Sequence, residues 1–135
     1  MAWKNYKELT VWKRAMVLTN LCYELYAQLP TQEIDILGAQ LRRSAVAVPA
    51  LIAEGNGRDL QREMYHYLVR ARGAVYALET TLLLCVQRSF LREKQCAEAL
   101  DLCDELSQML TSLTLRQNHG VQKRYAESVL KEDEA

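Results

Sequence analysis

Apolar residues recur at alternating steps of three and four along most of this chain, and few turn-forming residues interrupt them. Because an α-helix has 3.6 residues per turn, this spacing gathers the apolar side chains on one face of a helix. Only five glycines and two prolines occur among the 135 residues. The pattern therefore predicts long helices that are joined by short connections.

We expect four helices, over residues 10–29, 32 or 33 to 54, 60–88 and 92–117. Pro30 should end the first helix, Gly55 should cap the second, and Asp59 should be the N-cap of the third. The spacing also predicts one core face for each helix. In the first helix it consists of Trp12, Ala15, Met16, Thr19, Cys22, Tyr26 and Leu29, and in the second of Leu37, Leu41, Ala45, Val48 and Ile52. In the third helix it consists of Met64, Leu68, Ala71, Val75, Leu78 and Leu82, and in the fourth of Cys96, Ala99, Cys103, Leu106, Leu110 and Leu113.

Short connections between long helices place neighbouring helices antiparallel, so the predicted fold is all-α, an antiparallel up-and-down four-helix bundle. Residues 1–118 are assigned to the bundle, and residues 119–135 to a charged, flexible C-terminal tail. We expect no signal peptide, because polar residues follow Met1 closely, and no apolar run approaches the roughly 20 residues that span a membrane. Its four cysteines lack CxxC spacing and are expected to be reduced thiols, so we expect a soluble cytoplasmic protein with no membrane partner.

Pro49 lies in the middle of the second predicted helix, within the segment RRSAVAVPALIAEGNGR. Proline lacks an amide hydrogen and clashes with the carbonyl four residues earlier, at a cost of roughly 3 kcal/mol or more. Since apolar residues keep helical spacing from Leu41 to Ile52, we predict that the helix continues through Pro49 with a bend. The carbonyl of Ala45 then loses its partner, and water or a neighbouring side chain should satisfy it.

The sequence gives little support for catalysis. Glu63 and His66 form half of a di-metal motif, but such a site needs a second Glu-x-x-His pair and two further glutamates. Cys96 and Cys103 fall on the predicted core face and read as packed thiols. We therefore expect no catalytic residue, no metal site and no cofactor. An enzyme would need polar side chains between the packed helices, where this sequence places Leu, Val, Ala and Cys.

The formal net charge is zero, yet charge is unevenly distributed along the chain. The middle segment, residues 42–72, contains six arginines and no lysine against three acidic residues. Guanidinium groups suit phosphate and, equally, carboxylates of another protein or helix. The predicted nucleic-acid or partner-binding residues are Arg42, Arg43, Arg58, Arg62, Arg70 and Arg72.

A second apolar line runs along the third predicted helix, outside its core face. It includes Tyr65, Val69 and Tyr76, and small residues such as Gly73 and Ala77 would let another helix approach closely. The tyrosines either cover the edge of the bundle or form a subunit interface, where Tyr and Arg are favoured. We favour an oligomer interface on this line.

Three segments in this order, LTVWKRA, QLRRSAVAVPALIAEGNGR and ARGAVYALETTL, resemble one family over about residues 3–115. It comprises the four-helix-bundle proteins encoded in intervening sequences of bacterial large-subunit rRNA genes and the accessory variability determinants of diversity-generating retroelements. The positions that match the family pattern are Trp12, Arg42, Arg43, Pro49, Ile52, Ala53, Glu54, Gly55, Gly57, Arg58, Arg72, Gly73, Leu78, Glu79 and Thr80.

The resemblance implies a non-catalytic adaptor that assembles as a homopentameric ring. In the retroelement branch it implies binding of RNA or DNA and of a partner reverse transcriptase, with structured RNA or an RNA–DNA hybrid as the nucleic acid. In the rRNA branch RNA binding is possible but no activity is established. Apolar Ala47, Ala50 and Leu51 replace polar residues common in the family, so Pro49 and Leu51 join the predicted interface.

Overall fold

The computed structural model describes the backbone of residues 5–58 and 60–134, and the side chains of residues 5–58, 60 and 62–116. After a short 3₁₀ turn, η1 (Tyr6–Glu8), the four long helices are α1 (Thr10–Tyr26), α2 (Ala39–Asn56), α3 (Gln61–Gln87) and α4 (Glu93–Glu134). A 3₁₀ turn, η2 (Thr31–Glu33), and a π-helical turn, η3 (Ile34–Gly38), lead into α2. The described residues form no strand.

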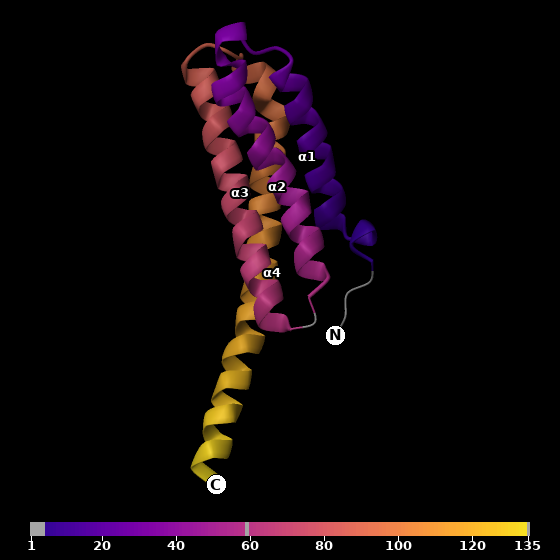
Figure 1. Ribbon diagram of the computed structural model, residues 1–135, viewed down its shortest axis with the longest axis vertical. Helices are drawn as coiled ribbons and strands as arrows, with labels where there is room; N and C mark the ends of the chain where they lie inside the picture. Colours follow the sequence, from indigo (N-terminus) through magenta and orange to yellow (C-terminus); the bar gives the residue numbers. More distant parts are fainter. Residues whose placement is uncertain (1–4, 59, 135) are drawn as a thin grey trace.

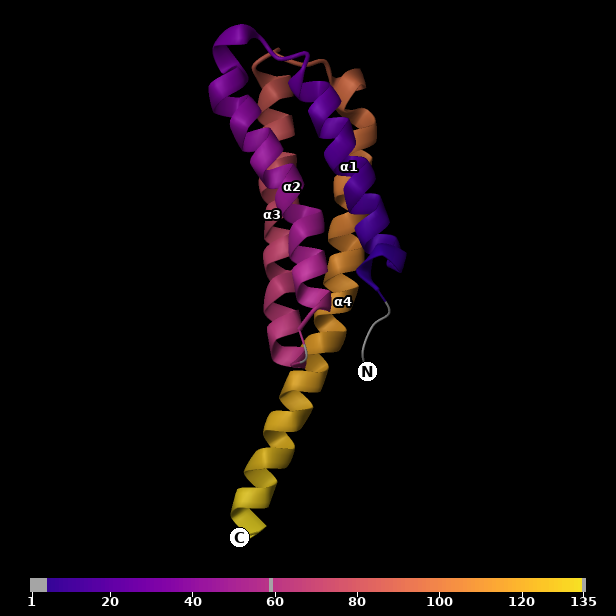
Figure 2. The same ribbon diagram turned by 45° about the vertical axis from the view of Figure 1, so that its right-hand side comes forward.

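The helices run alternately up and down, and each packs against its two neighbours in the order α1, α2, α3, α4 and back to α1 (Figures 1 and 2). The prediction of an all-α four-helix bundle is confirmed. Three of the four predicted core faces are also found almost as expected: Leu41, Val48, Leu68, Leu78 and Leu106 are fully buried. Burying a side chain of this size contributes roughly 1.5–3 kcal/mol, so these faces hold the bundle together.

The core face of α1 differs from the prediction. Val11, Leu18 and Leu25 are buried, whereas Met16 is 36% exposed and Tyr26 is half-buried. Apolar residues surround most of α1, so two neighbouring faces fit the helical period. The packing of α2 and α4 on either side decides between them.

α4 is longer than predicted. Its helical backbone continues from Glu93 to Glu134, past the expected end at residue 117, and its last turns extend beyond the other three helices (Figures 1 and 2). Gly120 costs a helix interior about 1 kcal/mol relative to alanine, which does not end a helix whose following residues are mostly good helix formers. The division of the chain into residues 1–118 and 119–135 stays a prediction.

The continuous helical segment Thr31–Asn56 is long and apolar enough to cross a membrane by length and composition alone, although we expected no such segment. The core helix of a bundle meets the same criterion. α2 buries Leu41, Ala45, Val48 and Ile52 completely among the other helices, which accounts for its apolar character.

α3 ends in a Schellman motif that contains no glycine. Ser89 follows the C-cap residue Arg88 and has a φ of 61°, and its amide donates to the carbonyl of Val86 (3.0 Å). The amide of Phe90 donates to the carbonyl of Cys85 (2.8 Å). Glycine is the usual residue here because a Cβ atom makes the left-handed region unfavourable.

We therefore expect Ser89→Gly to raise the free energy of unfolding by about 1 kcal/mol, measured by urea denaturation. Ser112, which is exposed in the interior of α4, provides the control. Ser112→Gly should lower stability by roughly 0.5 kcal/mol, because glycine is disfavoured in a right-handed helix. Equal effects of the two substitutions would contradict a left-handed Ser89.

Candidate functional site

Two of the six predicted arginines meet at one tyrosine ring near the connection between α2 and α3. The guanidinium carbon of Arg58 lies 4.7 Å from the centroid of the Tyr67 ring, and its Nη2 donates a hydrogen bond to the Tyr67 hydroxyl (2.6 Å). The guanidinium carbon of Arg70 lies 5.5 Å from the same centroid. Each cation–π contact at an exposed site contributes about 0.5–1 kcal/mol. Tyr67 thus holds two guanidinium groups around one ring.

Gly55 makes this arrangement possible. A Cβ atom on Gly55 would lie only 2.9 Å from the Cβ atom of Tyr67, so α2 and α3 can approach each other here only because Gly55 has no side chain. The prediction that Gly55 caps α2 is wrong: it lies within α2, and the C-cap residue is Gly57, with a φ of −79°. The predicted N-cap Asp59 lies outside the described residues, and Leu60 occupies the N-cap position of α3.

The arginine cluster has no carboxylate partner among the described side chains. The one ion pair found there joins Arg14 and Glu105, 2.9 Å apart. Arg58 and Arg70 are exposed, and so is Arg62 in the first turn of α3. Their hydrogen-bond donors are available to a phosphate or a carboxylate from another molecule.

Arg42 and Arg43 lie near the other end of α2. The guanidinium carbon of Arg42 is 4.1 Å from the centroid of the Tyr26 ring, and its Nε atom is buried without a hydrogen-bond partner among the described residues. Arg43 is exposed. The Cβ atom that Gly38 lacks would lie 2.9 Å from the Tyr26 ring, so this glycine leaves room for the stacked pair.

Arg72 faces α4. It is half-buried, and its Nη1 donates to the hydroxyl oxygens of Thr111 (3.4 Å) and Thr114 (3.3 Å). These long bonds link α3 to α4. Arg72 therefore has a packing role that Arg58 and Arg70 do not share.

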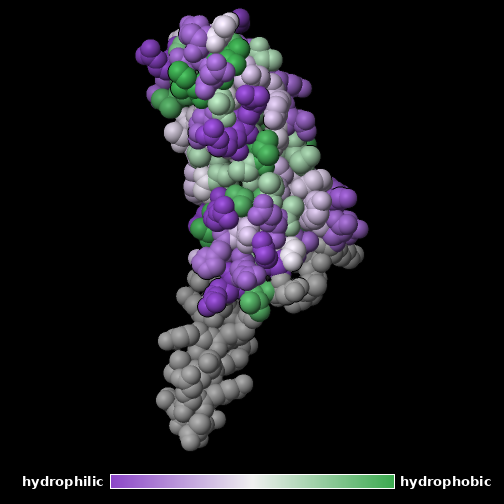
Figure 3. Space-filling view, viewed as in Figure 1, coloured by the Kyte–Doolittle hydropathy of each residue, from purple (hydrophilic) through white to green (hydrophobic). Residues whose placement is uncertain are grey.

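Of the six predicted arginines, Arg58 and Arg70 thus lie near one end of α2, and Arg42 and Arg43 lie near the other. In the space-filling view, hydrophilic residues gather toward both ends of the described part of the bundle, and a more apolar band lies between them (Figure 3). Arg58 and Arg70 share the Tyr67 ring just beyond the C-terminal end of α2, whereas Arg42 and Arg43 lie in the first two turns of that helix.

The five predicted interface residues lie in different environments. Tyr76 is 48% exposed on α3, and Tyr65 and Val69, about three and two turns earlier on the same helix, are half-buried. Pro49 and Leu51 are buried inside the bundle of a single chain. Only the three α3 residues therefore offer surface to another subunit.

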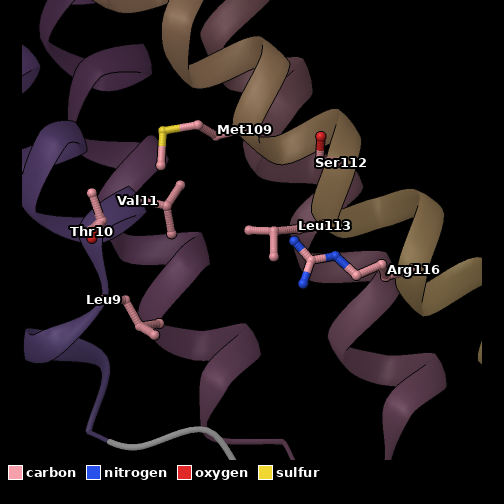
Figure 4. A pocket seen from close by; sticks show the side chains of 7 residues that line it. All are labelled: Leu9, Thr10, Val11, Met109, Ser112, Leu113 and Arg116. Carbon is pink, nitrogen blue, oxygen red and sulfur yellow. The ribbon is translucent and has the colours of Figure 1, made fainter.

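A pocket of about 410 Å³ opens between the start of α1 and α4 (Figure 4). Leu9, Val11, Met109 and Leu113 supply its apolar lining, and the guanidinium group of Arg116 lies beside Leu113. Two hydroxyl groups, of Thr10 and Ser112, complete the lining, which contains no acidic residue or histidine. The described residues contain no group of three or more His, Cys, Asp or Glu side chains that could hold a metal ion.

The sequence reasoning identified the arginines but missed the aromatic residues that orient them. Tyr67 precedes Arg70 by three residues, a spacing that brings side chains together on a helix, and this signal was available. The contact between Arg58 and Tyr67 depends on the turn between α2 and α3, and the contact between Arg42 and Tyr26 depends on the π-helical turn before α2. Neither follows from helical periodicity.

Comparison with known protein families gives a match over most of the chain. The model of a family described as 23S rRNA-intervening sequence protein matches residues 7–112. A comparison with curated proteins found no match. The matched segment contains all six arginines, both stacked tyrosines and the four-helix core.

Proposed function

Because the chain belongs to the family of 23S rRNA-intervening sequence proteins, we propose that it is a non-catalytic adaptor that binds structured RNA. The observation that carries the proposal is the cluster of Arg58 and Arg70 around Tyr67, with no carboxylate partner among the described side chains. Arg14 pairs with a carboxylate and Arg72 donates to two hydroxyl groups of α4, whereas Arg58 and Arg70 are exposed and contact only Tyr67, so most of their donors remain available to a ligand.

The chemistry of this cluster suits phosphate. A guanidinium group presents forked donors that match two oxygens of a phosphate. Stacking on Tyr67 and the hydrogen bond from Arg58 restrict the side chains before binding, so less conformational entropy is lost when a ligand arrives. Contacts between these arginines and the phosphates of an RNA strand would position the RNA on the protein but would not depend on its base sequence.

We also propose that the subunits assemble as a homopentameric ring, in which each copy of the cluster adds to the total affinity through avidity. In the retroelement branch of the resemblance, the partners would be a reverse transcriptase and an RNA–DNA hybrid. In the rRNA branch, RNA alone would be bound. The neighbouring genes distinguish the two: a reverse transcriptase gene with a template repeat, or a surrounding rRNA gene. The free, buried cysteines suit a cytoplasmic location.

A bend of α2 at Pro49 belongs to the same proposal. The helix continues through Pro49, and the hydroxyl of Thr19 donates to the carbonyl of Ala45, 2.8 Å away. A bend there would orient Arg42 and Arg43 toward a subunit junction or the surface of the ring. A crystal structure in which the axis of α2 is straight at Pro49 would remove this part of the proposal.

The RNA-binding prediction concerns a protein in which both Arg58 and Arg70 are changed to alanine. We expect the wild-type protein to bind a fluorescently labelled RNA hairpin with an affinity that falls steeply as salt increases, because phosphate contacts release counterions. The double variant should bind more weakly, and its slope of log K against log salt concentration should be shallower by roughly two units. Fluorescence anisotropy at several salt concentrations measures both quantities.

The matched control changes Arg88 and Arg92 to alanine, which removes the same charge from exposed positions outside the cluster. The control should retain most of the wild-type affinity. Circular dichroism establishes that both variants fold. Equal weakening of the two double variants, or no salt-dependent binding by the wild type, would contradict the proposal and assign the arginines to a protein partner.

A further inference from the structure

The outer face of α3 carries an unusual uncharged surface. From residue 73 to residue 87 the only charged residue is Glu79, which is half-buried. In the same stretch Tyr76 is 48% exposed, Leu83 is 43% exposed and Leu84 is 42% exposed. Surfaces from which charged residues are depleted and in which aromatic residues are enriched are typical of the centre of a protein interface.

Gly73 lies within this surface, in the interior of a 27-residue helix. A Cβ atom on Gly38 or Gly55 would lie within 2.9 Å of a tyrosine side chain, so packing within the chain explains both of these glycines. A Cβ atom on Gly73 would meet nothing within 4 Å. Glycine is less favourable than alanine inside a helix, and no contact within the described part of the chain offsets this cost at Gly73.

The spacing around Gly73 is that of a helix-packing seam. Val69, Gly73, Tyr76, Thr80 and Leu83 follow steps of four, three, four and three, which place them on one face of α3. This seam is separate from the buried face of α3 that forms the bundle core. Because Gly73 has no Cβ atom, a helix from another molecule can approach the seam closely at this position.

A second uncharged surface lies between α1 and α2. The hydrogen bond from Thr19 to Ala45 brings the two helices together at this level. Met16 and Tyr23 lie about one turn on either side of Thr19 and are 36% and 45% exposed, and Val46 beside Ala45 is 43% exposed. Residues 16–23 and 44–53 contain no charged residue, and the exposed charges of Lys13, Glu24 and Arg43 border this surface.

The outer face of α4 has the opposite character. Glu98, Asp101 and Asp104 are exposed there. An acidic face is a poor match for either uncharged surface, because burying unpaired carboxylates is costly. The two uncharged surfaces therefore match each other better than either matches α4.

We propose that the α3 seam of one copy of this chain packs against the α1–α2 surface of the next copy. This inference rests on the oligomer of the proposed function and specifies how its subunits contact one another. The two surfaces differ and lie on different helices, so the contact is heterologous, and repetition of such a contact closes into a ring when the rotation permits. The Arg58–Tyr67–Arg70 cluster is not needed for the contact.

Two single variants and their mixture test the proposal. Tyr76→Glu introduces a charge into the α3 seam, and Val46→Glu introduces one into the α1–α2 surface. Light scattering should find each variant monomeric at a concentration at which the wild type is assembled. A mixture should contain heterodimers, because one intact seam and one intact α1–α2 surface remain between the two variants. Gln108→Glu, which adds the same charge to exposed α4, should keep the wild-type mass.

Gly73→Ala gives a readout that a loss of folding cannot produce. In the monomeric Val46→Glu background it should raise the thermal unfolding midpoint, because alanine favours the helix and the added Cβ atom meets no neighbour. In the otherwise wild-type chain it should weaken assembly, with a higher dissociation constant. Unchanged assembly of Gly73→Ala would overturn the close approach at this position.

Two further outcomes of these experiments would overturn the proposed contact. If Val46→Glu assembles normally while Tyr76→Glu does not, the α3 seam pairs with itself and the head-to-tail contact is wrong. If the wild type is a monomer, both this inference and the ring are wrong. RNA binding by Arg58 and Arg70 is measured separately on the same samples, so its outcome does not depend on assembly.

Discussion

Replacing Thr19 by valine should lower the free energy of unfolding by about 1–3 kcal/mol, because it leaves a buried carbonyl without a hydrogen-bond donor. The hydroxyl of Thr19 donates to the carbonyl of Ala45 (2.8 Å) and lies 2.9 Å from the carbonyl of Ala15. The carbonyl of Ala15 also has the amide of Thr19 as its helical donor. The carbonyl of Ala45 has no such donor, since the residue four positions later is Pro49.

The substitution Pro49→Ala identifies this mechanism. Alanine restores the amide that Pro49 lacks, so the carbonyl of Ala45 regains its partner within α2. In the Pro49→Ala background, Thr19→Val should therefore cost much less than in the wild type. Urea unfolding of the four proteins at one fixed protein concentration gives the coupling energy, which we expect to be about 1–2 kcal/mol.

Thr81 is the control for the loss of a hydroxyl group. Its hydroxyl donates to the carbonyl of Ala77 (2.9 Å), and it is buried with 4% of its surface exposed. That carbonyl keeps its helical donor, the amide of Thr81, when the hydroxyl is removed. Thr81→Val should change stability by less than about 0.5 kcal/mol. A coupling energy near zero between positions 19 and 49 would contradict the role assigned to Thr19.

Thr19 also marks the limit of what the sequence could predict. Helical spacing on both sides of Pro49 was enough to predict that α2 continues, and the structure confirms the continuous helix. The need for a new donor to Ala45 followed from the chemistry of proline. The identity of that donor did not, because it comes from α1 and depends on how α1 and α2 pack.

The faces of α3 and α4 were predictable for a different reason. In α4 one line, which includes Cys103, Leu106 and Leu110, is buried, and charged residues occupy much of the rest of the circumference. α3 has two apolar lines, but the buried one is made of aliphatic residues such as Leu68, Val75 and Leu82, whereas the outer one contains tyrosines and is interrupted by Gly73 and Thr80. α1 lacks this contrast, and periodicity alone selected Met16 where packing buries Leu18. The local pattern therefore predicts a core face only where one face of the helix is clearly more aliphatic than the others.

The candidate site was also predictable from the sequence only in part. The uneven charge distribution identified the arginines. The orientation of a guanidinium group, however, is fixed only where another side chain contacts it. Tyr67 does so for Arg58 and Arg70 because Gly55 lets the backbones of α2 and α3 come close. This glycine resembled a helix cap in the sequence, since close approach between helices has no local signature.

The four cysteines lead to the second large effect, a loss of stability at alkaline pH. All four thiols are free and buried. Burial raises the pKa of Cys22 from its ordinary value of 9.0 to about 12, with a smaller contribution from Cys96, and burial likewise raises the pKa of Cys103 to about 12. The pKa of Cys85 rises to about 11 for the same main reason. The folded protein therefore keeps these thiols protonated well above pH 9.

The direction of the effect follows from proton binding. Between pH 9 and pH 12 an unfolded chain releases these protons while the folded chain retains them, so stability falls as pH rises. Each pH unit in this interval costs about 1.4 kcal/mol for each of Cys22 and Cys103. At pH 11, Cys22 and Cys103 together should cost about 5 kcal/mol, a large part of the 5–15 kcal/mol typical of a folded domain.

Urea denaturation between pH 8 and pH 11 measures this loss. In Cys22→Ala and Cys103→Ala the stability at pH 8 should fall, because each substitution leaves a small cavity, but the decline toward pH 11 should be shallower than in the wild type. A slope that neither substitution changes would show that other groups cause the alkaline loss.

Thiol reactivity tests the same burial without unfolding the protein by pH. Because the thiolate is the reactive form, the native thiols should react with a disulfide reagent at pH 8 only as fast as the bundle opens. A cysteine introduced at exposed Ser112 should react within the mixing time and serves as the reference. Rapid reaction of all four native thiols would contradict the raised pKa values and the sealed core. If the native thiols react only at the rate at which the bundle opens, then packing of the whole core, and not a property of any one cysteine, limits their reaction with the reagent.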